Sequence, residues 1–141
     1  MQSRPTSLAG NWTGVFDYDD PDTDAVPFTA SLFDVAGAVW GTTREPNSFA
    51  PGAGEALDAE VNGTRTGAEV TFRKVYTPQP PNGEDPVLYS GHVVADGQRV
   101  EGRWEIRHPV GTIGGPFVMN RERGKTVEAP RAVAAEVDAE A

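Results

Sequence analysis

The stretch VLYSGHVVADGQRVEGRWEI, residues 87–106, decides the fold, because it joins two segments of alternating residues through Asp96-Gly97. An Asp-Gly pair in this setting is a strong signal for a β-hairpin. Counting outward from the turn gives facing pairs that are apolar or small, namely Val93 with Val100, Gly91 with Gly102, Tyr89 with Trp104 and Val87 with Ile106. The pairs on the other face are mostly polar, namely His92 with Glu101, Ser90 with Arg103 and Leu88 with Glu105. We therefore predict that the first face lies in a core and that the second meets water.

The whole chain has the composition of an all-β protein. It contains 16 glycines and 12 prolines among its 141 residues, and no long segment with helical periodicity precedes its last residues. This pattern predicts eight short strands, which we place at residues 10–18, 26–35, 38–45, 55–63, 68–76, 87–95, 98–107 and 115–121.

The links between these strands alternate in length. Short turns are predicted at 36–37, 64–67 and 96–97, and long links rich in proline and glycine at 19–25, 46–54, 77–86 and 108–114. Successive links of a meander lie at opposite ends, so the short turns gather at one end and the long loops at the other. Eight such strands close readily into an up-and-down antiparallel β-barrel. We predict this barrel over residues 1–123, followed by a low-complexity acidic tail, 124–141, that is flexible or a frayed helix.

Two further hairpins assign side chains to the barrel interior in the same way. A turn at Ala36-Gly37 places Phe28, Ala30 and Leu32 inside, opposite Glu45, Thr43 and Gly41. For the third hairpin we align Val61 with Val70, which pairs Ala59 with Phe72, Leu57 with Lys74 and Glu55 with Tyr76. Because side chains alternate along a strand, Lys74 points inward together with Phe72.

Charge and composition disfavour or exclude several classes of function. Twenty-one acidic residues against 12 basic ones give a net charge of −9, which disfavours binding to nucleic acid or to an anionic membrane surface. The absence of cysteine excludes disulfides, thiol chemistry and cysteine-rich zinc sites. The first ten residues lack the apolar run of a signal peptide, so we expect a cytoplasmic protein.

Four short motifs carry a family resemblance. They are SLAGNWTG (residues 7–14), GAVWGTTRE (37–45), the hairpin at 87–106 and FVMNRE (117–122). Together they resemble avidin and streptavidin, and the first also resembles the wider calycin group that includes the lipocalins. The resemblance implies a barrel in which Trp12 stacks on Arg121 at the closed end. Biotin binding is not implied, since Gly14, Tyr18 and Thr43 stand where avidins place Asn, Ser and Tyr.

Lys74 is the most informative residue of the predicted interior. It lies late in a strand that runs toward the long loops, and a buried lysine is costly unless it is paired, so Glu45 or Glu55 is its expected partner. We predict a pocket at this mouth in which Lys74 and the carboxylates hold the polar head of a ligand. The apolar body of the ligand would contact Phe28, Phe72, Tyr89 and Trp104, and the remaining pocket residues are Tyr18, Thr43, Tyr76 and His108. The leading function is therefore non-catalytic binding of a small molecule, without a cofactor or metal.

Other interpretations of the same residues stay open. Lys74 and a glutamate could form a structural pair that plugs the barrel, or a β-bulge could turn Lys74 outward. Alternatively, Lys74, Glu45, Glu55 and the tyrosines could form the acid–base set of an enzyme of the isomerase or hydrolase type.

The outer face has one unexpected feature. Phe33 and Trp40 should pair across their hairpin and point away from the interior, near Val35. An exposed aromatic patch of this kind usually marks a contact surface. We predict a homodimer through this patch, and packing of the C-terminal tail over it is the alternative. If the barrel interior is plugged, the chain would be an interaction module that acts through this face.

Overall fold

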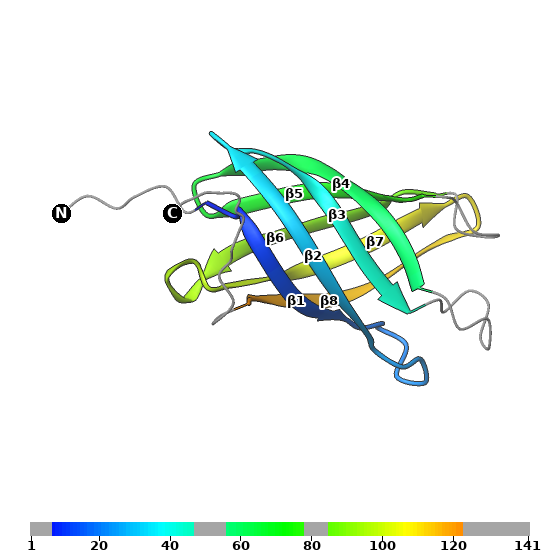
Figure 1. The fold of residues 1–141 in the computed structure, drawn as a ribbon. Helices are drawn as coiled ribbons and strands as arrows, with labels where there is room; N and C mark the ends of the chain where they lie inside the picture. The colour runs from blue at the N-terminus through cyan, green and yellow to red at the C-terminus, as the bar shows by residue number, and fades with distance from the viewer. Residues whose placement is uncertain (1–6, 47–55, 78–84, 123–141) are drawn as a thin grey trace.

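Eight antiparallel strands in the described part of the chain form a closed barrel in sequence order (Figure 1). The structure is a computed structural model and describes residues 7–46, 56–77 and 85–122. The strands are β1 (Gly10–Phe16), β2 (Val26–Val35), β3 (Ala38–Pro46), β4 (Ala56–Thr66), β5 (Glu69–Tyr76), β6 (Val87–Val94), β7 (Arg99–His108) and β8 (Gly111–Arg121). Because β1 pairs with both β2 and β8, the sheet closes on itself. The predicted all-β, up-and-down barrel is confirmed, and the predicted tail at 124–141 lies outside the described residues.

The two ends of the barrel differ in their links (Figure 1). The turns β2–β3, β4–β5 and β6–β7 lie at one end, which we call the turn end. The β1–β2 link lies at the other end, together with the last residues of β3 and β5 and the first residues of β4 and β6, and we call this the loop end. No helix within the described ranges is long and apolar enough to cross a lipid bilayer.

The β7–β8 link differs from its prediction as a long loop at 108–114. His108 pairs directly with Gly111, so the two strands form a long hairpin with a tight turn. Two of the glycines in this part of the chain, Gly114 and Gly115, are places where another backbone segment approaches. A Cβ on Gly115 would lie 2.1 Å from the carbonyl oxygen of Asp17. The chain beyond β1 uses this space, since the Asp17 amide donates to the carbonyl oxygen of Pro116 at 2.9 Å.

The register of two hairpins is as predicted. Leu32 lies opposite Gly41 in β2–β3, and Tyr89 lies opposite Trp104 in β6–β7. The β6–β7 turn is longer than the predicted two residues, because it contains the short 3-10 element η1 (Ala95–Gly97). The turn takes one additional residue from each strand, so the strand residues keep their predicted partners.

The predicted register of the β4–β5 hairpin is wrong by four residues. Val61 lies opposite Lys74, not Val70, because β4 continues to Thr66 before the turn. Side chains alternate with a period of two, so a shift by an even number leaves every residue on its predicted face. Lys74 therefore still points inward.

The barrel interior is filled by side chains. Large aromatic residues from six of the described strands lie in it, namely Trp12, Phe16, Phe28, Phe72, Tyr76, Tyr89, Trp104 and Phe117. Between them a cavity of about 10 Å³ remains, lined in part by Thr43, Lys74 and Met119. A cavity needs roughly 10–15 Å³ to hold one water molecule. This cavity therefore has no room for a molecule larger than water.

Candidate functional site

Lys74 ends in a closed ionic cluster near the loop end. Its Nζ lies 2.9 Å from Oε1 of Glu45, and the hydroxyl of Tyr76 donates to Oε2 of the same carboxylate at 2.8 Å. The Lys74 side chain is 3% exposed and that of Glu45 is 1% exposed. The alternation of inward residues on β3 and β5 brings these three groups together. Lys74 keeps the inward position that the alternation of β5 gives it, so the alternative of a β-bulge that turns it outward is wrong.

Aromatic rings complete the surroundings of the ammonium group. The Nζ of Lys74 lies 4.8 Å from the ring centres of Phe16 and Tyr76 and 5.6 Å from that of Tyr89. Ring faces attract cations, so they replace part of the lost hydration. The ammonium group thus lies beside the Glu45 carboxylate and three aromatic rings.

The tyrosines around this cluster stay protonated at neutral pH. Burial raises the pKa of Tyr76 above its ordinary value, and Tyr89 shows the same effect. Burial also raises the pKa of Tyr18, and the nearby Glu45 carboxylate adds to this increase. The Tyr76 phenol is therefore a hydrogen-bond donor to Glu45.

The predicted apolar contacts of a ligand pack against one another. The rings of Phe72 and Tyr89 stack with centres 4.8 Å apart. Trp104 packs edge-on against Phe16 at 5.6 Å, and its indole N–H donates to the carbonyl oxygen of Asp17 at 2.7 Å. Phe28 is also buried. These residues form the core that fills the barrel.

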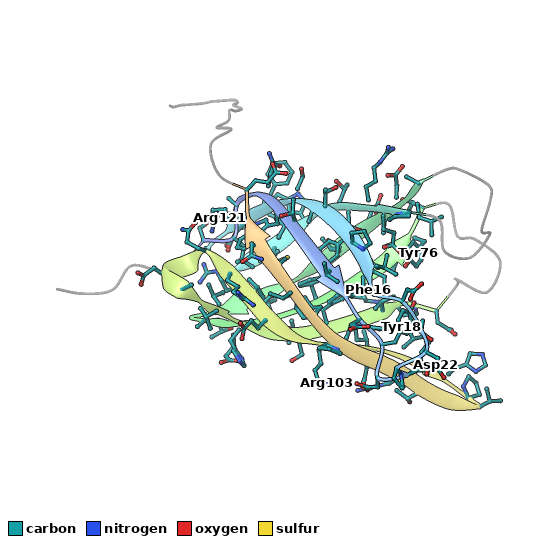
Figure 2. All side chains as sticks on the ribbon, turned by 90° about the horizontal axis from the view of Figure 1, so that it is seen from below. Phe16, Tyr18, Asp22, Tyr76, Arg103 and Arg121 are labelled. Atoms are coloured by element: carbon teal, nitrogen blue, oxygen red, sulfur yellow. The ribbon has the colours of Figure 1, made fainter. Side chains whose placement is uncertain are left out.

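The remaining predicted pocket residues are placed differently from one another. Tyr18 is half-buried beyond the end of β1, edge-on to Trp104 at 5.1 Å, and lies toward the same end as Tyr76 (Figure 2). Thr43 is buried beside the small cavity, and its hydroxyl has no hydrogen-bond partner among the described residues. His108 is exposed at the β7–β8 turn, with Nε2 4.0 Å from Oδ2 of Asp85. Glu55 lies outside the described residues.

Trp12 and Arg121 close the turn end of the barrel. In Figure 2, Arg121 lies at the opposite end from Tyr76. The Arg121 guanidinium lies 4.5 Å from the centre of the Trp12 ring. Its nitrogen atoms donate to the carbonyl oxygens of Ala9 at 2.7 Å, Ser7 at 2.8 Å and Gly97 at 3.0 Å. Arg121 therefore ties the start of β1 and the end of β8 to the β6–β7 turn.

A second ion pair at the turn end was missed by the sequence interpretation. Nε of Arg65 donates to Oδ2 of Asp34 at 2.7 Å, and the two side chains are 6% and 1% exposed. Asp34 also accepts from the amides of Leu8 at 2.8 Å and Gly37 at 3.1 Å. Asp34 and Arg65 lie an even number of residues beyond the inward residues Leu32 and Val61. Extending the predicted alternation along both strands would therefore have placed them in the interior.

The outer wall of β1, β2 and β3 is free of charge over most of its length. Its exposed side chains are Asn11, Thr13, Val15, Pro27, Thr29, Ser31, Phe33, Val35, Ala38, Trp40 and Thr42, and we call this set the neutral face. Phe33 and Trp40 stack across it with ring centres 5.4 Å apart and are 57% and 40% exposed. The first charged outward residue on these strands is Arg44, near the loop end.

Comparison with protein-family models and with curated proteins finds no match for this chain. The described strands form a small, closed, eight-stranded antiparallel β-barrel. It is compatible with the avidin-like and calycin barrels that the sequence motifs resemble, and membership of either family stays a prediction.

Proposed function

We propose that this chain is a non-catalytic interaction protein whose filled barrel presents the neutral face to a second copy of itself. The observation that carries the proposal is the absence of charge around the exposed Phe33–Trp40 stack, within the described outer wall. Interface centres are depleted of charged residues and enriched in aromatic ones. The buried Lys74–Glu45 pair is then part of the scaffold.

The distribution of charge favours a second copy as the partner. The chain carries a net charge of −9, and the charged outward residues of the described strands lie mainly on β4, β5 and β7, such as Glu60, Glu69 and Glu101. Arginines, namely Arg73, Arg99, Arg103 and Arg107, lie among these acids, and several of the charges are already paired on the same wall. Two copies that met through those strands would have to desolvate these charges, and the neutral face lets them approach without that cost.

The shape of the neutral face is also suited to pairing with itself. A hollow of about 340 Å³ on this wall is lined by Asn11, Thr29, Ser31 and Thr42, and also by the charged residues Arg44, Asp58 and Glu122. In a two-fold dimer, the projecting Trp40 of each copy can enter the hollow of the other, because such an interface uses the same patch twice. Buried tryptophan is among the residues that contribute most to binding.

Sedimentation velocity of the full chain tests this proposal. We expect a concentration-dependent dimer, and Trp40→Glu should weaken association at least about thirtyfold, the factor for a 2 kcal/mol contact. Val110→Glu is the matched control, because Val110 is 89% exposed at the β7–β8 turn, outside the neutral face. A wild-type protein that stays monomeric at several hundred micromolar would contradict the proposal.

Binding of a small molecule at the loop end is the second candidate, and the buried cluster of Lys74, Glu45 and Tyr76 favours it. A buried ion pair often adds less stability than apolar side chains of the same size, and such groups are frequent at functional sites. A ligand larger than water would have to bind above the cluster, near Tyr18, or move the core rings apart. An acid–base enzyme built on these residues would face the same restriction.

Native mass spectrometry distinguishes this second candidate. A small molecule that co-purifies with the wild type and is lost from Lys74→Met would support a ligand anchored by Lys74. The absence of a bound molecule from both proteins would argue that Lys74 has no binding role.

A further inference from the structure

The wall opposite the neutral face carries a groove of about 710 Å³ that runs across the outside of β4 to β8. This wall is opposite because β6 lies four strands from β2 in a ring of eight. The groove volume falls within the range of roughly 300–1,000 Å³ that is usual for small-molecule sites. The groove involves residues that the sequence interpretation treated only as a wet surface.

Its floor is made by small and hydroxylated residues. Thr64, Thr71 and Ser90 come from β4, β5 and β6, and Gly114 from β8 adds no side chain. The hydroxyls of Thr64 and Thr71 lie 3.4 Å apart. These short side chains leave space between the longer residues at the edges and offer hydrogen bonds to a polar group.

Two of the three arginines that line the groove already have carboxylate partners. Arg103, which points out from the wall in Figure 2, pairs with Asp19, and Arg107 pairs with Glu105. Arg73 forms no ion pair within residues 7–46, 56–77 and 85–122. The groove therefore contains one uncompensated positive charge, on a chain whose net charge is negative.

Apolar side chains line the same groove as this guanidinium. Leu88 is the strand partner of Arg73 and is half-buried, and Ile113 of β8 is 54% exposed. Both line the groove. A molecule lying in it can contact an apolar surface and a cation at once.

We propose that this groove binds a small amphipathic carboxylate, with the carboxylate on Arg73 and the apolar body against Leu88 and Ile113. The planar guanidinium can donate two parallel hydrogen bonds to a carboxylate. A single uncompensated charge suits a monoanion, because a second negative charge would lie near Asp19 and Glu105. The charge of the rest of the chain is screened beyond about 8 Å at physiological salt, so the local arginine dominates. This proposal is independent of the neutral face.

Amide NMR of the full chain, titrated with sodium octanoate and separately with octanamide, tests the proposal. We expect octanoate to shift amides around Thr71–Arg73 and Leu88–Ser90, and Arg73→Gln to weaken its binding about three- to tenfold. The neutral octanamide should bind more weakly and should not respond to Arg73→Gln. Arg44→Gln is the matched control, since it removes an exposed arginine from outside the groove.

Three results would overturn the proposal. They are the absence of octanoate binding, equal shifts with octanoate and octanamide, and unchanged octanoate affinity in Arg73→Gln. Because Arg73 is exposed, the variant should fold, and its amide spectrum reports this directly.

Discussion

Removing one member of the Lys74–Glu45 pair should destabilise the barrel far more than removing both charges. Glu45→Gln leaves the buried ammonium of Lys74 without its counter-charge, and Lys74→Met leaves the carboxylate without its counter-charge while the Tyr76 hydroxyl still donates to it. The side chains are 3% and 1% exposed, so water cannot replace the missing partner. Breaking a buried pair in this way costs about 3–5 kcal/mol.

The double variant Lys74→Met/Glu45→Gln should recover most of that loss. Methionine fills much of the space of the lysine, and glutamine still accepts the Tyr76 hydrogen bond without carrying a charge. The double variant should therefore be more stable than either single variant. The interaction energy from the double-mutant cycle should therefore exceed about 3 kcal/mol, because the double variant costs less than either single variant.

Urea unfolding followed by tryptophan fluorescence measures these differences. With a slope of about 2 kcal/mol per molar urea, each single variant should lower the midpoint by about 2 M. Additive effects of the two substitutions would refute the reasoning, because they would mean that the charges do not interact in the folded protein. A Lys74→Met variant as stable as the wild type would refute the burial of the pair.

Two further outcomes follow from the buried polar groups. Burial alone would raise the pKa of Asp34, but the hydrogen bonds from Arg65 and from the amides of Leu8 and Gly37 outweigh it and hold the pKa below its ordinary value. The Asp34 carboxylate therefore stabilises the fold above pH ~4, and this contribution is lost as the pH falls through its lowered pKa. We expect Asp34→Asn to cost about 3 kcal/mol at neutral pH and less in acid. Urea midpoints measured across this pH range would show the difference. Thr43→Val should raise the thermal midpoint by the equivalent of about 1 kcal/mol, because it removes a buried hydroxyl that has no partner among the described residues. A lower midpoint in calorimetry would show instead that the hydroxyl is hydrogen-bonded.

The parts of the fold that the sequence predicts are those fixed by local turns and by alternation. The turn at Ala36-Gly37 set the register of β2–β3 correctly, and the Asp96-Gly97 signal did so for β6–β7. The β4–β5 turn carried a weaker signal, and an inward Arg65 looked like the start of a loop. Its partner Asp34 lies 31 residues away, so local pattern alone could not explain an arginine inside the barrel.

The candidate site was predictable in its membership but not in its packing. Alternation alone directed Glu45, Lys74 and Tyr76 to the interior. It could not choose between Glu45 and Glu55 as the partner, because that choice depends on distances across the barrel. Nor could it show that the aromatic rings fill the space, since cavity volume depends on how side chains from all strands interlock. The groove beside Arg73 depends on the same three-dimensional detail.

The seam between β1 and β8 has a consequence for synthesis. Arg121 bonds to the backbone of Ser7 across 114 residues, and Trp12 pairs with Arg121 across the strands. During translation β1 can pair with β2 early, but its other edge has to wait for nearly the whole described chain to emerge from the ribosome. Contacts between such distant residues form slowly, and an open strand edge can pair with another chain. The first strand made is thus the last to be enclosed, and nascent chains are most exposed to mutual pairing just before the final strand appears.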